Sequence, residues 1–215
     1  MTDYHSARER MVEQQLRRRG IEDERVLAAM AEVPRELFVP APAREQAYAD
    51  SALPIGEEQT ISQPWIVAAI CQALELEGSE LVLEVGTGSG YSAAVLARLA
   101  AHVVSVERRE PLSRVAAGVV DRLEVRNVEL VVGDGSLGVP ERAPFDAIAV
   151  HATAPAPPRT LVDQLADDGR LVVPVAAGDN DVLTLLRRHG RQIEIRSLGP
   201  CRFVPLIGEE GYSGE

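Results

Sequence analysis

From residue 81 onward, short apolar runs alternate with stretches whose apolar residues recur at helical spacing. Apolar runs of this length are typical of strands that are buried on both faces of a parallel sheet. Their alternation with helices predicts an α/β fold with a doubly wound, mostly parallel sheet. The expected strands are residues 81–85, 103–107, 128–132, 145–150 and 170–175.

The clearest of the intervening helices follows residue 107. Pro111 stands in its first turn, where the missing N–H has no consequence because the first amides of a helix have no partner within it. Apolar residues then recur every three or four positions, which predicts a face packed on the sheet. The expected stripe is Leu112, Val115, Val119 and Leu123.

About the first 75 residues are expected to form helices and loops. Helical spacing runs through residues 26–33, where Pro34 ends it, and again through residues 63–76. Ser62 stands just before the second segment, where a helix N-cap is expected. The stretch between the two helices is polar and contains proline and glycine, which predicts a loop.

After Pro174 the pattern changes to strand, turn and strand, which favours an antiparallel edge. Residues 202–207 are expected to form a last strand, and residues 208–215 a loose tail or, at most, a lid. We expect a single domain, because 215 residues suffice for one sizeable core and are short of the usual two-domain length. Its parts are a helical cap with a loop (1–77), the α/β core (78–175), and the C-terminal strands and tail (176–215).

The charge of the chain narrows the range of partners. The formal net charge is -11, and the 22 basic residues are all arginines, scattered except for the run Arg17 to Arg19. Because binding of nucleic acid depends largely on clustered Lys and Arg, we expect no nucleic-acid partner. The arginine run is expected to be a solvated helix face.

The cysteines and the hydropathy of the chain bear on metal binding and location. Cys71 and Cys201 are far apart and lack the spacing of a zinc site, so we expect buried, reduced thiols and no bound metal. No apolar run approaches the ~18 residues of a membrane span, and the N-terminus shows no charged and then apolar leader. We therefore expect a cytoplasmic protein without a membrane partner, and a monomer.

The strongest chemical signal is a glycine-rich segment, residues 84–91, which closes the first predicted strand and opens the next helix. Glycines are needed there because the chain turns sharply and its backbone approaches a ligand closely. The spacing is Gly86-x-Gly88-x-Gly90, whereas the nicotinamide or flavin fingerprint is G-x-G-x-x-G. An NAD-dependent oxidoreductase is therefore the least favoured enzyme.

Acidic residues follow the next two strands. Glu107 ends the second strand about 20 residues after Gly86, where a carboxylate can accept hydrogen bonds from both ribose hydroxyls. Asp134 and Gly135 follow the third strand, where the aspartate can accept from an adenine amino group and the glycine can leave room for the ring. Taken alone, this pair favours an ordinary Asp-Gly turn. Three successive strand ends nevertheless predict one crevice for an adenosine-containing cofactor.

These segments resemble the protein-L-isoaspartate O-methyltransferases, a family with the class I, Rossmann-like methyltransferase fold. The core carries VLEVGTGSGYSAAVLA, SVE, GDG and APFDAIAV. More specific are LPIGEEQTISQPWIVA at 53–68, which is similar to the family's signature loop, and RFVPLIG at 202–208, which is similar to its C-terminal segment. VPRELFV at 33–39 and GRLVVPV at 169–175 extend the similarity over nearly the whole chain.

The resemblance implies an enzyme that uses S-adenosyl-L-methionine and releases S-adenosyl-L-homocysteine. The implied acceptor is the free carboxylate of L-isoaspartyl residues in damaged proteins and peptides, with D-aspartyl residues as a further candidate. In this family the glycines lie close to the methionine part, the acidic residues hold the ribose and adenine, and Ser62 belongs to the active site. The implied cofactor-binding residues are Thr60, Ile61, Ser62, Glu84, Gly86, Thr87, Gly88, Ser89, Gly90, Glu107, Asp134 and Gly135.

No catalytic triad is visible, and this reaction does not require one. A carboxylate with a pKa near ~4 is already ionised at neutral pH and needs no general base. What remains is to hold the nucleophile in line and to exclude water, which hydroxyls and backbone N–H groups can do. Ser62 thus has two interpretations, a helix N-cap worth ~1 kcal/mol or a residue that seats the substrate, and both can hold at once.

Several positions depart from the family's usual pattern. Glu58 stands where the signature loop usually has glycine, and Glu57 precedes it; we favour a solvated loop tip, with weaker binding of acidic peptides as the alternative. His151 replaces the usual Thr and is expected to be a hydrogen-bonding spacer rather than a base. Thr153 falls where Ala is common, and Asp181 where the family tends to have Gln.

Two other functions stay open. A tailoring methyltransferase descended from the same family would act on one dedicated peptide or small molecule, and Glu58 and His151 favour it. A non-catalytic cofactor-binding module belongs to a different class of function, and the intact Ser62, Gly88 and Glu107 disfavour it.

Overall fold

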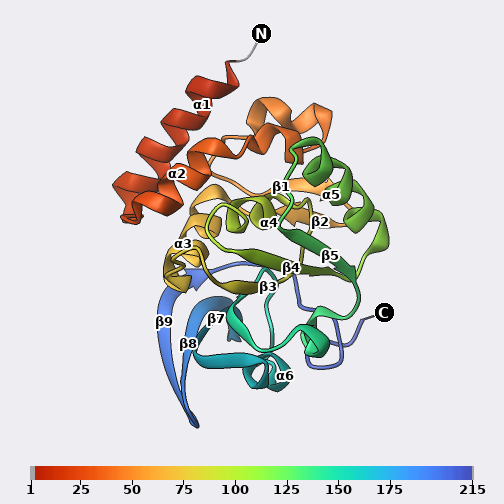
Figure 1. Cartoon of the computed structure of the whole chain (residues 1–215). Helices are drawn as coiled ribbons and strands as arrows, with labels where there is room; N and C mark the ends of the chain where they lie inside the picture. Colours follow the sequence, from red (N-terminus) through yellow and green to blue (C-terminus); the bar gives the residue numbers. More distant parts are fainter. Residues whose placement is uncertain (1–2, 215) are drawn as a thin grey trace.

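A sheet of seven strands forms the centre of the molecule (Figure 1). The computed structural model describes residues 3–214. The strand order is β5-β4-β3-β6-β7-β8-β9, with parallel pairing from β5 to β7 and antiparallel pairing of β8 and β9. The predicted α/β sheet with an antiparallel C-terminal edge is confirmed. The strands are β3 Leu81–Val85, β4 His102–Glu107, β5 Val128–Val132, β6 Phe145–Val150, β7 Leu165–Ala177, β8 Asn180–His189 and β9 Gln192–Cys201.

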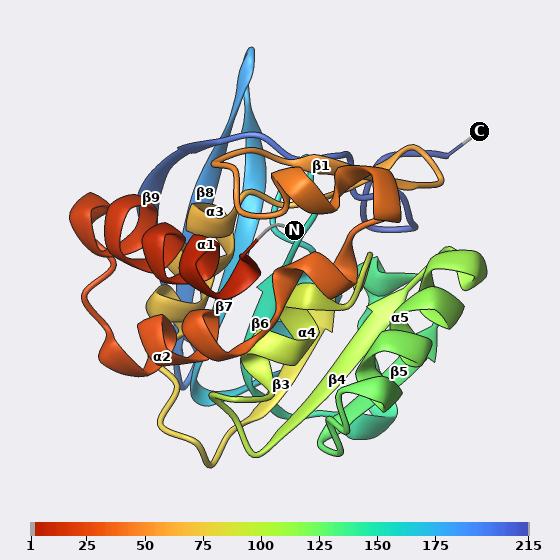
Figure 2. The same ribbon diagram turned by 90° about the horizontal axis from the view of Figure 1, so that it is seen from above.

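Helices cover both faces of the sheet, as Figures 1 and 2 show. Successive residues of a strand point to opposite faces, so Val82 joins the core beneath the N-terminal helices and Leu83 the core beside α6. The α-helices are α1 Tyr4–Arg10, α2 Glu24–Glu32, α3 Pro64–Leu74, α4 Tyr91–Leu96, α5 Glu110–Arg122 and α6 Arg159–Asp163. The π-helix is η1 Met11–Leu16, and the 3-10 helices are η2 Arg17–Arg19, η3 Arg35–Phe38, η4 Ala41–Gln46, η5 Gly135–Leu137 and η6 Pro140–Arg142.

Helix α5 buries most of the expected stripe. Leu112 and Val119 are buried as predicted and Leu123 is partly buried, but Val115 is 63% exposed, and Ala116 and Val120 are buried as well. Both sets of positions recur every three or four residues, so spacing alone does not distinguish them. The small Ala116 also allows a close approach, because a Cβ added at Gly90 would lie 3.1 Å from its Cβ.

The region expected to be a loop between α2 and α3 contains a two-stranded hairpin, β1 Leu53–Gly56 and β2 Gln59–Ile61. Glu57 and Glu58 form its tip and are exposed, with φ of 50° and 58°. Two consecutive left-handed residues are characteristic of the type I′ turn, whose twist matches that of the strands. The loop prediction was wrong here because strands this short show too few positions for a period of two.

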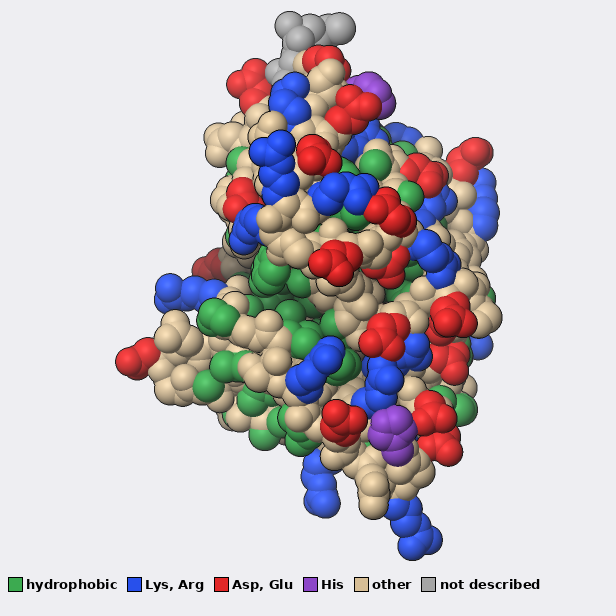
Figure 3. Space-filling view, turned by 90° about the vertical axis from the view of Figure 1, so that its left-hand side faces the viewer, with side chains coloured by type: hydrophobic (Ala, Val, Ile, Leu, Met, Phe, Trp, Pro, Cys, Tyr) green, Lys and Arg blue, Asp and Glu red, His purple; other side chains and the backbone are tan. Residues whose placement is uncertain are grey.

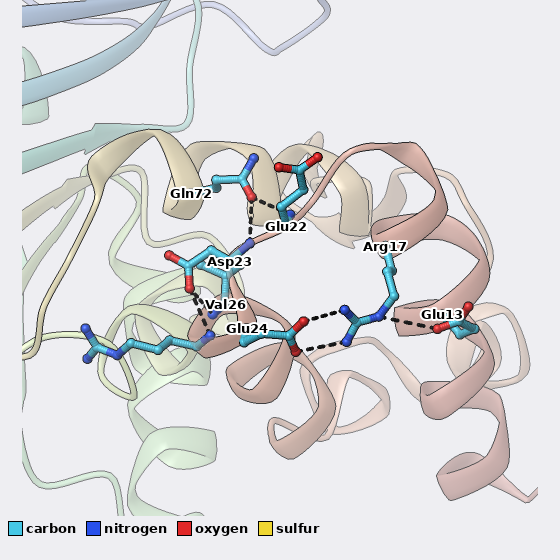
Figure 4. Close-up of polar contacts among 8 residues, drawn as sticks. Glu13, Arg17, Glu22, Asp23, Glu24, Val26 and Gln72 are labelled. Carbon is cyan, nitrogen blue, oxygen red and sulfur yellow. Dashed lines mark hydrogen bonds and ion pairs between the residues drawn. The ribbon is translucent and has the colours of Figure 1, made fainter.

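Gln72 of α3 forms hydrogen bonds with the chain just before α2 and so connects the N-terminal helices to the rest of the molecule (Figure 4). Its side-chain oxygen accepts hydrogen bonds from the backbone N–H groups of Glu22, at 2.7 Å, and Asp23, at 3.0 Å. Arg17 forms a two-pronged ion pair with Glu24 at the start of α2. The arginine run is exposed, as predicted, and it helps to hold the turn before α2.

The chain after β9 lies against the carboxyl ends of the strands (Figure 2), where it and β2 line the same cavity. The Thr153 N–H donates to the carbonyl of Val204 at 2.8 Å, and the Leu206 N–H donates to the carbonyl of Thr153 at 2.7 Å. Farther on, the Glu209 N–H donates to Asp134 at 2.8 Å. Residues 202–207 form isolated β-bridges in place of the predicted strand. The prediction of a loose tail was wrong for residues 208–214, because backbone hydrogen bonds and a β-bridge hold them in place.

Within residues 3–214, no helix is long and apolar enough to cross a membrane. In the same part of the chain, no group of three or more His, Cys, Asp and Glu side chains is arranged to hold a metal ion. Cys71 is buried, as predicted, whereas Cys201 is only half-buried.

Candidate active site

The strand order reverses between β3 and β6, and a cavity opens at the carboxyl ends of these strands. Ligands of open α/β sheets bind at such switch points. We name it the inner cavity; its volume of about 470 Å³ is within the ~300–1,000 Å³ of small-molecule sites. The predicted cofactor residues that line it are Thr60, Ile61, Ser62, Gly86, Thr87, Gly88, Ser89, Glu107 and Gly135. The described positions Glu84, Gly90 and Asp134 lie outside its lining.

The glycine-rich segment forms one wall of the inner cavity. Gly86 and Gly88 have φ of 94° and 53°, in the left-handed region that favours glycine. A Cβ added at Gly88 would lie 3.4 Å from Ile55 of β1, so a larger side chain would fill the space between this segment and the hairpin. Gly90 has another role, because it is the N-cap of α4 and packs against α5.

Glu107 lies at the end of β4 and is 6% exposed. One carboxylate oxygen accepts from the Gly88 N–H and the other from the Arg109 N–H, each at 2.9 Å. These bonds fix both oxygens beside the inner cavity, and each keeps lone pairs for another donor. A carboxylate held in this way can accept hydrogen bonds from two adjacent hydroxyl groups, which is the chemistry expected for a ribose.

Asp134 caps the turn η5, with one oxygen accepting from the Ser136 N–H at 2.9 Å and the other from the Glu209 N–H at 2.8 Å. Its contact with an adenine stays a prediction. Gly135 does line the inner cavity, but a Cβ added there would lie 2.5 Å from Cγ1 of Val85. The packing of β3 against this turn therefore already requires a glycine, whatever ring is bound.

A buried polar cluster lies behind the inner cavity, at the ends of β3 and β6. Glu84 is completely buried and accepts a hydrogen bond from the Ser105 hydroxyl at 2.5 Å. His151 Nε2 lies 2.8 Å from the Ser92 hydroxyl and 3.4 Å from the Glu84 carboxyl group. Burial raises the pKa of Glu84 to about 7 and lowers the pKa of His151 to about 4. His151 is therefore uncharged at neutral pH, and so low a pKa is poorly suited to a general base.

A second cavity, which we name the outer cavity, adjoins the inner one and has a volume of about 330 Å³. Thr60, Ser62, His151 and Val204 line both cavities. These four residues come from β2, from the chain just before α3, from the chain just after β6 and from the C-terminal segment. A group bound in one cavity can thus meet a group bound in the other at a junction built from distant parts of the chain.

Ser62 lies at this junction and does not cap α3. The N-cap is Gln63, because Pro64 occupies the first helical position, and no side-chain cap bond forms. The N-cap prediction for Ser62 was therefore wrong. Its carbonyl accepts from Nη2 of Arg35 at 2.8 Å, and within residues 3–214 its hydroxyl has no hydrogen-bond partner. That hydroxyl remains available to a bound group.

Arg35 supports the site, although nothing in the sequence pattern indicated it. The side chain is fully buried, Nε donates to the carbonyl of Ala47 at 2.7 Å, and the guanidinium lies 4.8 Å from the centre of the Tyr91 ring. Together with its bond to Ser62, it joins the N-terminal cap, the loop before α3 and the start of α4. A single arginine in a sequence gives no sign that it is buried, since arginine is mostly exposed.

Comparison with known sequences decides the family. The profile described as Protein-L-isoaspartate(D-aspartate) O-methyltransferase (PCMT) matches residues 6–211. The chain is 54% identical over 209 residues to the Protein-L-isoaspartate O-methyltransferase of Methanoculleus marisnigri, which covers 97% of this chain and 94% of the relative. This chain belongs to the protein-L-isoaspartate O-methyltransferase family. A relative from Syntrophobacter fumaroxidans, Protein-L-isoaspartate O-methyltransferase 1, is 51% identical over 214 residues and covers 100% of both chains.

Solved structures of the family share the class I methyltransferase fold described above. One protein-L-isoaspartate O-methyltransferase aligns with a TM-score of 0.86 and 32% identity over 95% of this chain and 67% of that chain. A putative member from Plasmodium falciparum, in complex with S-adenosyl-L-homocysteine, has a TM-score of 0.82 and 26% identity over 96% of this chain and 99% of that chain. The resemblance inferred from the sequence motifs is confirmed.

Two departures from the family's usual pattern are partners in the structure. The Thr153 hydroxyl donates to Oδ2 of Asp181 at 2.7 Å, and the Phe203 N–H donates to the same oxygen at 3.0 Å. The pair thus joins the residues after β6 and the start of β8 to the C-terminal segment that lines both cavities. Glu58 also has a structural consequence, since its φ of 58° is at a turn position that favours the glycine usual in the family.

Proposed function

We propose that this protein transfers a methyl group from S-adenosyl-L-methionine to the free carboxylate of L-isoaspartyl residues, and of D-aspartyl residues, in damaged proteins and peptides. The observation that carries the proposal is the junction of the inner and outer cavities, where the Ser62 hydroxyl has no protein partner within residues 3–214. Membership of the family supports it. A cytoplasmic location and a monomeric state form part of the same proposal.

The inner cavity suits an adenosine-containing cofactor. Glu107 offers two fixed carboxylate oxygens to a pair of hydroxyls, and the missing Cβ of Gly88 leaves space beside Ile55. The backbone of Gly86 can approach the remainder of the cofactor closely. When bound, S-adenosyl-L-methionine supplies a methyl group activated by its sulfonium. The Plasmodium falciparum relative bound to S-adenosyl-L-homocysteine supports the same choice of cofactor.

The outer cavity suits an acceptor that carries a negative charge. Arg19 and Arg202 line it, and among the described residues no Asp or Glu does. This is a local positive region in a chain whose formal net charge is -11. A carboxylate acceptor with a pKa near ~4 is ionised at neutral pH, so the low pKa of His151 does not hinder the reaction.

The residues at the junction then position the acceptor rather than activate it. The Ser62 hydroxyl can donate to the acceptor carboxylate, and Arg35 holds the Ser62 backbone in place. Val204 adds an apolar side chain to the lining at the same point. Holding two reactants in line can lower a barrier by roughly 7–11 kcal/mol, which is sufficient without proton transfer.

Methyl transfer to three peptides tests the proposal. The peptides share one sequence and contain L-isoaspartyl, D-aspartyl or L-aspartyl at a single position. We expect a base-labile methyl ester on the first two and none on the L-aspartyl peptide. Transfer only to an acceptor without such residues would instead establish a tailoring methyltransferase, and tight binding of S-adenosylmethionine without any transfer would establish a non-catalytic module.

A further inference from the structure

We propose that Arg202 is a specificity-determining residue that favours acceptors carrying a carboxylate, by placing an unpaired positive charge in the outer cavity. This inference rests on the proposed function and names a residue that discriminates among its substrates. The group recognised is a carboxylate, which can belong to the acceptor side chain itself or to a neighbouring acidic residue of the substrate.

Arg202 stands on a stretch of backbone that is fixed on both sides. It follows the last residue of β9, and the next N–H group, that of Phe203, donates to Asp181 at 3.0 Å. Thr153 then holds the carbonyl of Val204 at 2.8 Å. The Arg202 side chain is exposed and lines the outer cavity. A fixed backbone beneath a solvated side chain keeps the charge near the junction without burying it.

The charges that face the outer cavity single out Arg202. Arg19, the other arginine of its lining, pairs with Asp50 at 2.6 Å and lies 5.1 Å from the centre of the Trp65 ring. His151 lines the same cavity, and burial keeps it uncharged at neutral pH. Arg202 has no ion pair or side-chain hydrogen bond with any residue in the range 3–214. Its charge is thus the uncompensated one in this lining.

A third cavity adjoins the outer cavity, and its lining does not favour negatively charged groups. It has a volume of about 770 Å³ and shares Arg19 and Trp65 with the outer cavity, and Figure 3 shows hydrophobic side chains in the hollow on that side of the molecule. Its charged lining is mixed: Arg19, Glu22, Asp23, Glu75 and Arg196. Because both signs are present there, it is a poor discriminator of charge, and selection for a carboxylate is concentrated at Arg202.

The experiment compares Arg202→Gln with Arg191→Gln, which removes the same charge in the exposed turn between β8 and β9. Both are assayed on two L-isoaspartyl peptides that differ in one flanking residue, Asp or Asn. Since rim charges act mainly on association, we expect Arg202→Gln to lower kcat/KM by roughly 3- to 10-fold at low salt with kcat unchanged. The loss should shrink at high salt, because exposed charges are screened over ~10 Å at 0.1 M.

The two peptides distinguish the two sources of the carboxylate. An equal loss on both assigns Arg202 to the acceptor carboxylate, and a loss confined to the peptide with the Asp flank assigns it to the neighbouring residue. Arg202→Lys, which keeps the charge, should restore most of the rate, and calorimetric affinity for S-adenosylhomocysteine should stay at the wild-type value in all variants. Identical KM values and salt dependence for Arg202→Gln and Arg191→Gln would overturn the inference. Failure of the wild-type protein to methylate either peptide would instead overturn the proposed function.

Discussion

Replacing Glu84 by Gln should change how the stability of the protein depends on pH. Burial raises the pKa of Glu84 to about 7 from an ordinary 4.5. Between these two pH values the folded chain keeps a proton that the unfolded chain has lost, so this group makes the free energy of unfolding fall as pH rises. At ~1.36 kcal/mol per pKa unit, the loss reaches about 3 kcal/mol by pH 7.

His151 acts in the opposite direction. Burial lowers its pKa to about 4 from an ordinary 6.5. Between these values the unfolded chain holds a proton that the folded chain lacks, so this group makes the free energy of unfolding rise with pH, again by about 3 kcal/mol. The two windows overlap from about pH 4.5 to 6.5, and there the contributions of Glu84 and His151 nearly cancel in the wild-type protein.

In each single variant only one of these contributions remains, so the free energy of unfolding should depend on pH in a way that the wild-type protein does not show. Urea unfolding is measured between pH 4 and 8, and the free energy of unfolding of each variant is compared with that of wild type. Relative to wild type, Glu84→Gln should become more stable as pH rises from about 4.5 to 7, and His151→Asn less stable as pH rises from about 4 to 6.5. The double variant should lose both contributions and serves as the control. Profiles of the single variants that run parallel to wild type would refute the assigned titrations.

Glu107→Ala should weaken binding of S-adenosylhomocysteine in calorimetry, because each charge-assisted bond to a ribose hydroxyl contributes roughly 1.5–3 kcal/mol; unchanged affinity would remove Glu107 from the site. Ser62→Asp should leave the melting temperature unchanged, since Ser62 is not a cap, and should abolish turnover by setting a like charge against the acceptor; full activity would disprove the seating role. A double-mutant cycle with Thr153→Ala and Asp181→Ala should give a coupling of about 1 kcal/mol in unfolding, and purely additive effects would contradict the pairing.

The central strands could be predicted almost residue by residue. Strands β3, β5 and β6 begin and end at the expected residues because each run is mostly apolar, although each also contains one acidic residue, Glu84, Glu129 or Asp146. Strand β5 lies at the edge of the sheet and is only partly buried. Strand β7 was predicted only in part, since residues 165–169 carry Asp167, Asp168 and Gly169. Its pairing with β6 is irregular at that end, so burial does not impose an apolar pattern there.

The residues of the candidate site could be predicted where they directly follow a predicted strand. Glu107 and Gly88 follow strand ends, and the parallel sheet brings all such ends to one edge. Ser62 lines both cavities, and its place in the active site stays a prediction; its role as a cap was wrong because Pro64 shifts the start of α3 by one residue.

The rest of the site depends on contacts between distant segments, which one sequence does not reveal. Arg35 reaches Ser62, and Thr153 reaches Asp181, across 27 and 28 residues. Each of these four residues, taken alone, is an ordinary surface or loop residue in the sequence. Ser62 lines the outer cavity, and Asp181 holds the backbone N–H of Phe203, which lines it too, so this cavity became visible only in the folded chain.

A crystal structure with S-adenosylhomocysteine and an L-isoaspartyl peptide tests the central claim most directly. The cofactor product should occupy the inner cavity with its ribose hydroxyls on Glu107, and the isoaspartyl carboxylate should enter from the outer cavity and meet it beside Ser62. A peptide whose carboxylate lies away from this junction, or a cofactor product bound elsewhere than the inner cavity, would contradict the claim.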